Sequence, residues 1–546
     1  MDLSKGFGYS KITDSSEVSE QTDLFDPVTI EKGILGGRTQ VFRPLSENNE
    51  GPFQFNLESQ GPSQYLKLNS IRLGGKCRIV KNDGSNIDNG EDLSICNLFP
   101  QSLFKSVEPE FNNILVTDLA SPLSHYQAYI QTLLSYTPDA QFTQLQGQMF
   151  IPDEAGKFDN NSLDPEKITA YSFEDKQLLT TNLYRSRRSI EDPPGDSSGN
   201  NAGSGGTSGD QSKPTESKPS ENISREKRGI KTVTLSPSHF TADLINLSIS
   251  TDFEDYKNRS KKLLSLDRVN SGYTLRNEFI KNSRTFDFYI PPTCDILQSD
   301  RLLHPSISLR LKFTRSSDAF SILSPENDQY RIEIEDLKLY ARYISINPNI
   351  INSHAEQIEK KNPLIYPVNR TLMKSYNIPE GETSTYISRM FSGILPKSVV
   401  IGFVNSRAFH GTQKLNPWNF KHYDVSNCSV KMNGENVPLE PYTPNFRDDN
   451  YIRDYCEFYR NIGIDVNENC GNIVTPDMYK GGCFFSAYDL SGDQCNMLHR
   501  HETQTGNIDF QCLFRTPLPE SVTVIVYASL EADIEIGEKG PVVKYK

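Results

Sequence analysis

The stretch VTVIVYASLEADIEI, residues 522–536, decides the fold class. Apolar residues occupy every second position from Val522 to Ile536, and polar residues such as Thr523, Ser529 and Glu535 lie between them. A period of two places successive side chains on opposite faces of a β-strand. The stretch therefore predicts a long strand with one buried face.

Further stretches of the chain share this period. Residues 71–79 (IRLGGKCRI) and 307–314 (ISLRLKFT) alternate in the same way. Residues 332–343 also alternate, but the apolar positions change parity at Asp336. Such a change within a strand predicts a β-bulge or a change of sheet.

Helical signals are few. Residues 122–136 (PLSHYQAYIQTLLSY) carry apolar residues at three-to-four spacing and contain no internal Pro or Gly, so we expect one helix laid across a sheet. The 32 prolines and 34 glycines favour an all-β sandwich architecture. At 546 residues the chain is long enough for two such sandwiches in tandem.

Composition limits the possible functions. The formal net charge is −13, so the whole chain has no electrostatic attraction toward nucleic acid or an anionic membrane. With mean hydropathy −0.55 and no apolar run near the length of a membrane span, we expect no transmembrane segment. The first residues do not resemble a signal peptide, which predicts synthesis in the cytosol.

Changes in composition suggest three regions. Residues 1–47 are polar and acidic and are expected to form an arm or tail, 48–325 a first sandwich, and 326–546 a second. Residues 189–222 (SIEDPPGDSSGNNAGSGGTSGDQSKPTESKPSEN) are almost free of apolar residues. Such a segment cannot bury enough surface to order itself, so we expect a long disordered insert over 185–231. The alternative is a linker between two domains.

No catalytic or cofactor site is predicted. The sequence has no phosphate loop, nucleophile elbow or His-Glu-x-x-His motif, so we expect no enzyme activity and no cofactor. The nine cysteines have irregular spacing, which favours free, mostly buried thiols. His499 and His501 are interpreted as loop residues, and Trp418, the only tryptophan, as a packing residue.

Two basic clusters bracket residues 189–222. They match the pattern that furin-like proteases cut, and an exposed flexible loop suits a protease. The alternative is two solvated basic patches. The candidate processing residues are Arg185, Arg187, Arg188, Arg225, Lys227 and Arg228.

Several motifs together resemble a known family. In the first half they are GPSQYLKLNSIRLGGKCRIVKNDG (61–84), SLFKSVEPEFNNILVTD (102–118), SHYQAYIQTLLSY (124–136), DRLLHPSISLRLKFTRSSDAFSIL (300–323) and IEDLKLYARYISINP (334–348). In the second half they are GILPKSVVIGFV (393–404), NPWNFKHYDVSNCSVKMNGENVP (416–438) and GGCFFSAYDLSGDQC (481–495). In this order they resemble the double jelly-roll major capsid proteins of Maverick/Polinton-type, adintovirus-like DNA viruses. They are more distantly similar to the major capsid proteins of nucleocytoplasmic large DNA viruses.

The resemblance implies two tandem jelly rolls in a homotrimeric capsomer of pseudo-hexagonal outline, located in the virion and assembled in the host cytoplasm or nucleus. Its implied partners are copies of itself, neighbouring capsomers, and minor capsid or penton proteins. Such elements also encode adenovirus-type maturation proteases, and Ile34-Leu35-Gly36-Gly37-Arg38 matches their cleavage pattern. We expect Gly36 and Gly37 to lie in a flexible tail, where cleavage is easy, or to form an ordinary turn.

Three other hypotheses for the function remain. A minor capsid or vertex protein should carry a single jelly roll. A host-domesticated β-sandwich binding protein should show a secretory signal and clustered exposed aromatic residues. A β-sandwich hydrolase should show a catalytic cluster.

Overall fold

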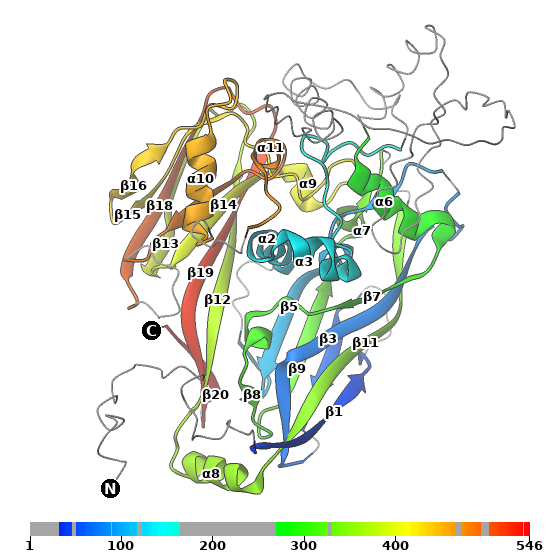
Figure 1. Ribbon diagram of the computed structural model, residues 1–546, viewed down its shortest axis with the longest axis vertical. Helices are drawn as coiled ribbons and strands as arrows, with labels where there is room; N and C mark the ends of the chain where they lie inside the picture. The colour runs from blue at the N-terminus through cyan, green and yellow to red at the C-terminus, as the bar shows by residue number, and fades with distance from the viewer. Residues whose placement is uncertain are drawn as a thin grey trace, which may run out of the picture.

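The computed structural model describes ten stretches of the chain: residues 32–45, 51–59, 61–88, 90–116, 123–163, 269–325, 330–464, 471–492, 502–538 and 540–545. The predicted disordered insert at 185–231, its basic clusters, and His499 and His501 lie outside the described residues. Figure 1 shows two β-sandwiches, one formed mainly by the first half of the chain and one by the second half.

The first sandwich has two antiparallel sheets. One has the strand order β1-β11-β3-β7, with β8 also paired to β3, and the other has the order β2-β9-β5-β6. The strands are β1 (Ile34–Phe42), β2 (Phe53–Leu57), β3 (Gln64–Lys81), β5 (Phe104–Phe111), β6 (Ile114–Leu115), β7 (Phe286–Ile290), β8 (Leu302–Leu303), β9 (Leu309–Arg315) and β11 (Tyr330–Ile346). Two short strands, β4 (Ser94–Ile95) and β10 (Ile322–Leu323), pair separately.

The second sandwich repeats this plan. Its sheets have the orders β12-β19-β14-β17, with β20 also paired to β19, and β13-β18-β15-β16. The strands are β12 (Leu364–Ile378), β13 (Ser384–Ile394), β14 (Ser398–Asn405), β15 (Val425–Met432), β16 (Glu435–Tyr442), β17 (Phe485–Asp489), β18 (Thr505–Phe514), β19 (Val522–Gly537) and β20 (Gly540–Tyr545).

The two sandwiches share one topology. When the eight main strands of each are counted along the chain, one sheet contains the first, eighth, third and sixth, and the other contains the second, seventh, fourth and fifth. Two four-stranded sheets connected in this way form a jelly roll. The predicted all-β fold with two tandem jelly rolls is confirmed.

The predicted strands are present, including the irregular one. Residues 71–79 lie in β3 and residues 522–536 in β19. The parity change at Asp336 coincides with a bulge in β11, where the register shifts between Glu335 and Lys338 and Asp336 has a φ of 51°. The β-bulge that the sequence predicted is therefore confirmed.

Helices lie between and around the sheets. The predicted helix is α2 (Ser124–Ser135), which lies between the two sandwiches (Figure 1). The other helical segments are α1 (Phe99–Ser102), α3 (Pro138–Phe142), η3 (Gln144–Gln148), α6 (Ser271–Ile280), η4 (Lys281–Ser283), η5 (Asp295–Gln298), α7 (Asp318–Ser321), α8 (Pro348–Glu359), α9 (Ser406–His410), α10 (Ile452–Asn461) and α11 (Pro476–Lys480). Among the described residues, no helix is long and apolar enough to cross a membrane.

The strand arrangement differs from the expected boundaries. β11 ends at Ile346 and still belongs to the first sandwich, because it pairs with β1 and β3. α8 then leads to β12 in the second sandwich, so the chain changes sandwich after 346 rather than at 325/326. β1 lies within the expected arm at 1–47, because pairing with β11 orders Ile34–Phe42.

The two hydrophobic cores do not follow the division of the chain. Tyr126 and Tyr129 of α2 belong to the core of the second sandwich. In the opposite direction, Tyr366 of β12 and Ile534 of β19 pack into the core of the first. Each core therefore contains side chains from both halves of the chain.

Candidate functional site

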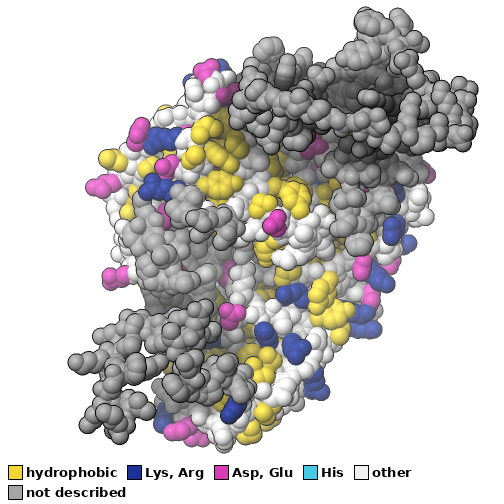
Figure 2. Space-filling view, in the orientation of Figure 1, with side chains coloured by type: hydrophobic (Ala, Val, Ile, Leu, Met, Phe, Trp, Pro, Cys, Tyr) yellow, Lys and Arg dark blue, Asp and Glu magenta, His cyan; other side chains and the backbone are white. Residues whose placement is uncertain are grey.

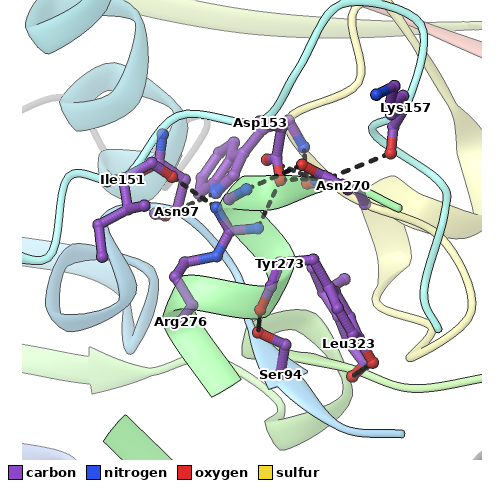
Figure 3. A network of polar contacts seen from close by, with 12 residues as sticks. Ser94, Asn97, Ile151, Asp153, Lys157, Asn270, Tyr273, Arg276 and Leu323 are labelled. Carbon is purple, nitrogen blue, oxygen red and sulfur yellow. Dashed lines mark hydrogen bonds and ion pairs between the residues drawn. The ribbon is translucent and has the colours of Figure 1, made fainter. Parts of the chain in front are cut away.

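Several buried polar and charged side chains, together with a buried tryptophan, lie where the two sandwiches meet. We call this region the junction. It is defined by Asp153, Asn270, Arg276, Asn416 and Trp418, all of them buried. They come from three distant parts of the chain: the loop after η3, the start and body of α6, and the β14–β15 connection. Figure 3 shows Arg276 directed from α6 toward Asp153.

Arg276 and Asp153 form a fully buried ion pair. Both side chains are 0% exposed, and Arg276 Nη2 lies 2.5 Å from Asp153 Oδ1. The guanidinium also donates to two main-chain carbonyls, from Nε to Ile95 O at 2.6 Å and from Nη1 to Ile151 O. Desolvating two charges is unfavourable, so a buried pair persists only when further hydrogen bonds complete it. These carbonyl bonds supply that completion on the arginine side.

Asp153 connects the two sandwiches. Its Oδ1 accepts a hydrogen bond from Asn270 Nδ2 at 2.7 Å, within the first half of the chain. Its Oδ2 accepts from Asn416 Nδ2 at 2.9 Å, in the second half. A carboxylate is an acceptor on both oxygens, so this one group is satisfied from both directions at once.

Trp418 fills the adjacent space. Its side chain is 0% exposed, its indole Nε1 donates to Asn97 O at 2.8 Å, and its ring stacks on Tyr129 with centroids 4.5 Å apart. Nearby, a Cβ added at Gly402 would lie only 2.5 Å from Phe420 Cδ1. Trp418 is therefore a packing residue, as expected, and it lies in the core between α2 and the second sandwich.

A second zone of contact lies along β12. Asp295 in η5 accepts hydrogen bonds from the Thr371 main-chain N–H at 2.8 Å and from Gln127 Nε2 at 2.9 Å. Arg301 Nη1 donates to Ile365 O at 2.6 Å. The sandwiches are thus tied by directional polar bonds at two separate places, which fixes their relative orientation.

Asp295 makes the stability of this second zone of contact depend on pH. Burial raises the pKa of Asp295 to about 6, against hydrogen bonds from Thr371 and Gln127 that lower it. The Asp295 carboxyl thus holds its proton more tightly in the folded chain than in the unfolded chain. The contribution of the protonated Asp295 carboxyl to the free energy of unfolding is fully present below the pKa of this group in the unfolded chain. It is lost as the pH rises through about 6.

Asp295→Asn should therefore remove part of the pH dependence of stability. Between pH 5 and pH 8 the wild-type chain is expected to lose about 1–2 kcal/mol of unfolding free energy through this group, and the variant is not. The amide can still accept from Thr371 and can donate to a rotated Gln127. Urea unfolding at both pH values measures this, with the exposed Asp300→Asn as the control for losing one charge. Equal pH slopes in wild type and Asp295→Asn would contradict the assignment.

The predicted processing residues have different outcomes. Arg185, Arg187, Arg188, Arg225, Lys227 and Arg228 lie outside the described residues. Gly36 and Gly37 lie in β1, hydrogen-bonded opposite Ser345 and Ile344 of β11, rather than in a flexible tail or a turn. A Cβ at Gly37 would lie 3.0 Å from Tyr343 O, so close sheet packing favours glycine there. Cleavage at Gly36-Gly37 would require this edge strand to detach.

Apart from Trp418, the residues of the junction were not predicted from the sequence. Asp153, Arg276 and Asn416 each occur in a polar surrounding of ordinary composition, and nothing local distinguishes them from surface residues. Among the described residues, no group of three or more His, Cys, Asp or Glu side chains could hold a metal ion.

Comparison with known proteins gives the fold. No protein-family model matches the sequence. A chain in the cryo-EM structure of the Sputnik virophage matches 97% of this chain and 92% of its own length, with a TM-score of 0.54 and 11% sequence identity. The match covers both sandwiches, and the strand orders are those of two jelly rolls. This chain is a double jelly roll.

Further matches have lower TM-scores or cover less of the chain. The mavirus major capsid protein matches 99% of this chain and 94% of its own, with a TM-score of 0.44 and 10% identity. The Faustovirus major capsid protein matches 96% and 95%, with a TM-score of 0.44 and 9% identity. By sequence, an uncharacterized protein of Caenorhabditis elegans, F54H12.2, is 22% identical over 243 residues, which are 43% of this chain and 58% of that protein. This chain thus spans little more than half of that relative.

Proposed function

We propose that this double jelly roll is a viral major capsid protein that self-associates as a homotrimer. The observation that carries the proposal is the presence of two jelly rolls of identical strand order in one chain, joined as one block. Three copies would bring six jelly rolls around a threefold axis, which gives a pseudo-hexagonal outline from cyclic symmetry. Units of that outline can tile a closed icosahedral shell.

The junction supports this role. A shell needs capsomers whose parts keep a fixed orientation, because small rotations accumulate across many copies. The buried ion pair of Arg276 and Asp153 and its bond to Asn416 link the sandwiches in one defined geometry. This favours a rigid building block over two sandwiches on a flexible linker.

Exposed apolar side chains at sheet edges support self-association. Leu439 on β16 is 88% exposed and Leu35 on β1 is 64% exposed, and each strand is the edge of its sheet. Unprotected apolar edges tend to be covered by another chain. Figure 2 shows apolar side chains mixed with charged ones over both sandwiches, as in interfaces that form after folding.

The finer parts of the proposal rest on the sequence resemblance. They are membership of the Maverick/Polinton-type, adintovirus-like group, a place in the virion, assembly in the host cytoplasm or nucleus, and contacts with minor capsid or penton proteins. They also include a structural, non-enzymatic role and processing by a maturation protease at Gly36-Gly37 or a furin-like protease at the two basic clusters. N-terminal sequencing and intact mass of assembled particles test the processing.

The mass of the full chain in solution tests the trimer. Light scattering is expected to give three times 61.7 kDa, and negative-stain electron microscopy should show a pseudo-hexagonal outline. Leu439→Lys should weaken the trimer at least tenfold while the single chain still folds, because this side chain is 88% exposed in it.

Leu439→Met is the matched control, since it keeps an apolar side chain of similar size. A chain that stays monomeric at micromolar concentration would overturn the capsomer. A trimer that tolerates Leu439→Lys would remove β16 from the interface.

A second candidate is a host-resident β-sandwich protein descended from such a gene. The similarity to a Caenorhabditis elegans protein favours it, because that relative comes from an animal. A minor capsid or vertex protein is disfavoured, because two jelly rolls are present instead of one. A folded monomer of the full chain that forms no hexagonal particles would favour the host-resident protein.

A further inference from the structure

Two cysteines lie directly opposite each other in the second jelly roll. Cys428 of β15 and Cys512 of β18 are register partners in the antiparallel sheet, and they are 1% and 0% exposed. Opposed residues in such a pair have Cα atoms about 4.5 or 5.5 Å apart and side chains on the same face. A disulfide spans Cα separations of about 4.4–6.8 Å, so it fits here without movement of the strands.

The surroundings of Cys428 activate its sulfur. Tyr488 Oη donates to Cys428 Sγ at 3.2 Å, and Ser486 Oγ donates to Tyr488 Oη at 2.8 Å. Burial acts to raise the pKa of Cys428, but hydrogen bonds from Cys512, Tyr488 and Ser486 outweigh it, so the pKa is lowered. Burial raises the pKa of Cys512 and of Cys96, which lies outside the pair. Because Tyr488 donates a hydrogen bond to its sulfur, Cys428 is the better nucleophile of the pair.

We propose that Cys428 and Cys512 form an oxidisable dithiol that closes into a cross-strand disulfide when the protein meets a small peroxide. Both sulfurs are buried, so a small oxidant suits the site better than a protein oxidoreductase. α10 helps to enclose the site, because Asn461 Nδ2 donates to Tyr442 Oη at 2.7 Å and Tyr442 packs against Tyr488.

The reaction balances with one peroxide. The Cys428 thiolate attacks hydrogen peroxide, an S–O bond forms, the O–O bond breaks, and the hydroxide released takes up a proton to become water. Cys512 then attacks this sulfur, the S–S bond forms, and the S–O bond breaks with release of a second water. Two thiols are oxidised and one peroxide is reduced.

The disulfide would lock one sheet of the second jelly roll. It closes a loop that contains β16, α10, α11 and β17, and it joins the adjacent strands β15 and β18. A cross-link of this kind restricts the unfolded chain more than the folded one. Oxidation is therefore expected to stabilise this sandwich whether the chain is a monomer or a trimer.

Peptide mapping of the full-length protein tests the proposal. After excess hydrogen peroxide, followed by denaturation and alkylation, we expect a Cys428–Cys512 peptide and no alkylation at Cys428 or Cys512, both reversed by dithiothreitol. Thermal unfolding of the oxidised chain should occur at a higher temperature, by on the order of 10 °C. Recovery of Cys428 and Cys512 as free thiols, while the exposed Cys456 is oxidised, would overturn the proposal.

Three variants assign the roles. Cys512→Ser should stop at a sulfenic acid on Cys428, detectable with dimedone. Tyr488→Phe should slow oxidation of Cys428 several-fold, because it removes the hydrogen bond to the sulfur. Cys96→Ser is the matched control, since it removes a buried thiol outside the pair and should leave the Cys428–Cys512 link unchanged. An unchanged rate in Tyr488→Phe would contradict the activation of Cys428 by Tyr488.

Discussion

Asp153→Ala is expected to lower the free energy of unfolding by about 3–5 kcal/mol. The substitution leaves the Arg276 guanidinium charged and 0% exposed, with main-chain carbonyls but no counter-ion. It also removes the acceptor for Asn270 and Asn416, so two buried amide groups lose a hydrogen bond. Because Asn416 belongs to the second sandwich, the loss should also loosen the connection between sandwiches. Urea denaturation followed by circular dichroism measures the change.

Glu356→Ala is the control for Asp153→Ala. Glu356 pairs with Lys360 on α8, with side chains 63% and 58% exposed, and surface pairs of this kind contribute about 0–1 kcal/mol. A double-mutant cycle with Arg276→Leu separates the pair from the other contacts, and we expect the double variant to lose less than the two single losses added. A loss below about 1 kcal/mol in Asp153→Ala would contradict the role of the buried pair.

Trp418→Ala is expected to lower the free energy of unfolding by about 3–5 kcal/mol, chiefly through the cavity it leaves. The ring lies between Tyr129, stacked at 4.5 Å, and Tyr126, packed edge-on at 5.1 Å. The substitution also leaves Asn97 O without its indole donor. Circular dichroism during urea unfolding measures the loss, since the variant has no tryptophan to observe by fluorescence.

Two comparisons make the Trp418 experiment specific. Phe142→Ala removes an aromatic side chain that is 54% exposed, so its effect should stay within about 0.5 kcal/mol. Trp418→Phe keeps an aromatic ring but removes the N–H donor, so it should be less harmful than Trp418→Ala. Equal stability of Trp418→Ala and wild type would show that the junction contributes little to folding.

Local alternation made the strands predictable. Each residue of a strand is placed on one face by the backbone alone, so β3 and β19 could be found without knowing their partners. The bulge at Asp336 was found for the same reason, because an inserted residue shifts the apolar parity on one side of it. Helices α6, α8 and α10 were not predicted, and no residue of α8 is buried.

Pairing between distant segments could not be predicted in the same way. Ile34–Phe42 is polar and glycine-containing enough to suggest a tail, yet β11 orders it as the edge strand β1. The end of the first sandwich was placed at 325 because nothing within 330–346 states which sheet it joins. Strand alternation reports which face is buried but not which neighbour buries it.

The sequence by itself determined that this protein is all-β, that its strands suffice for two sandwiches, and where the main strands and one bulge lie. These features depend on side-chain alternation within a few neighbouring residues. Only the tertiary structure decided that Asp153, Arg276 and Asn416 share one buried site and that Cys428 faces Cys512. Those contacts join residues far apart in the chain, and their stability comes from desolvation, which no local stretch of sequence records.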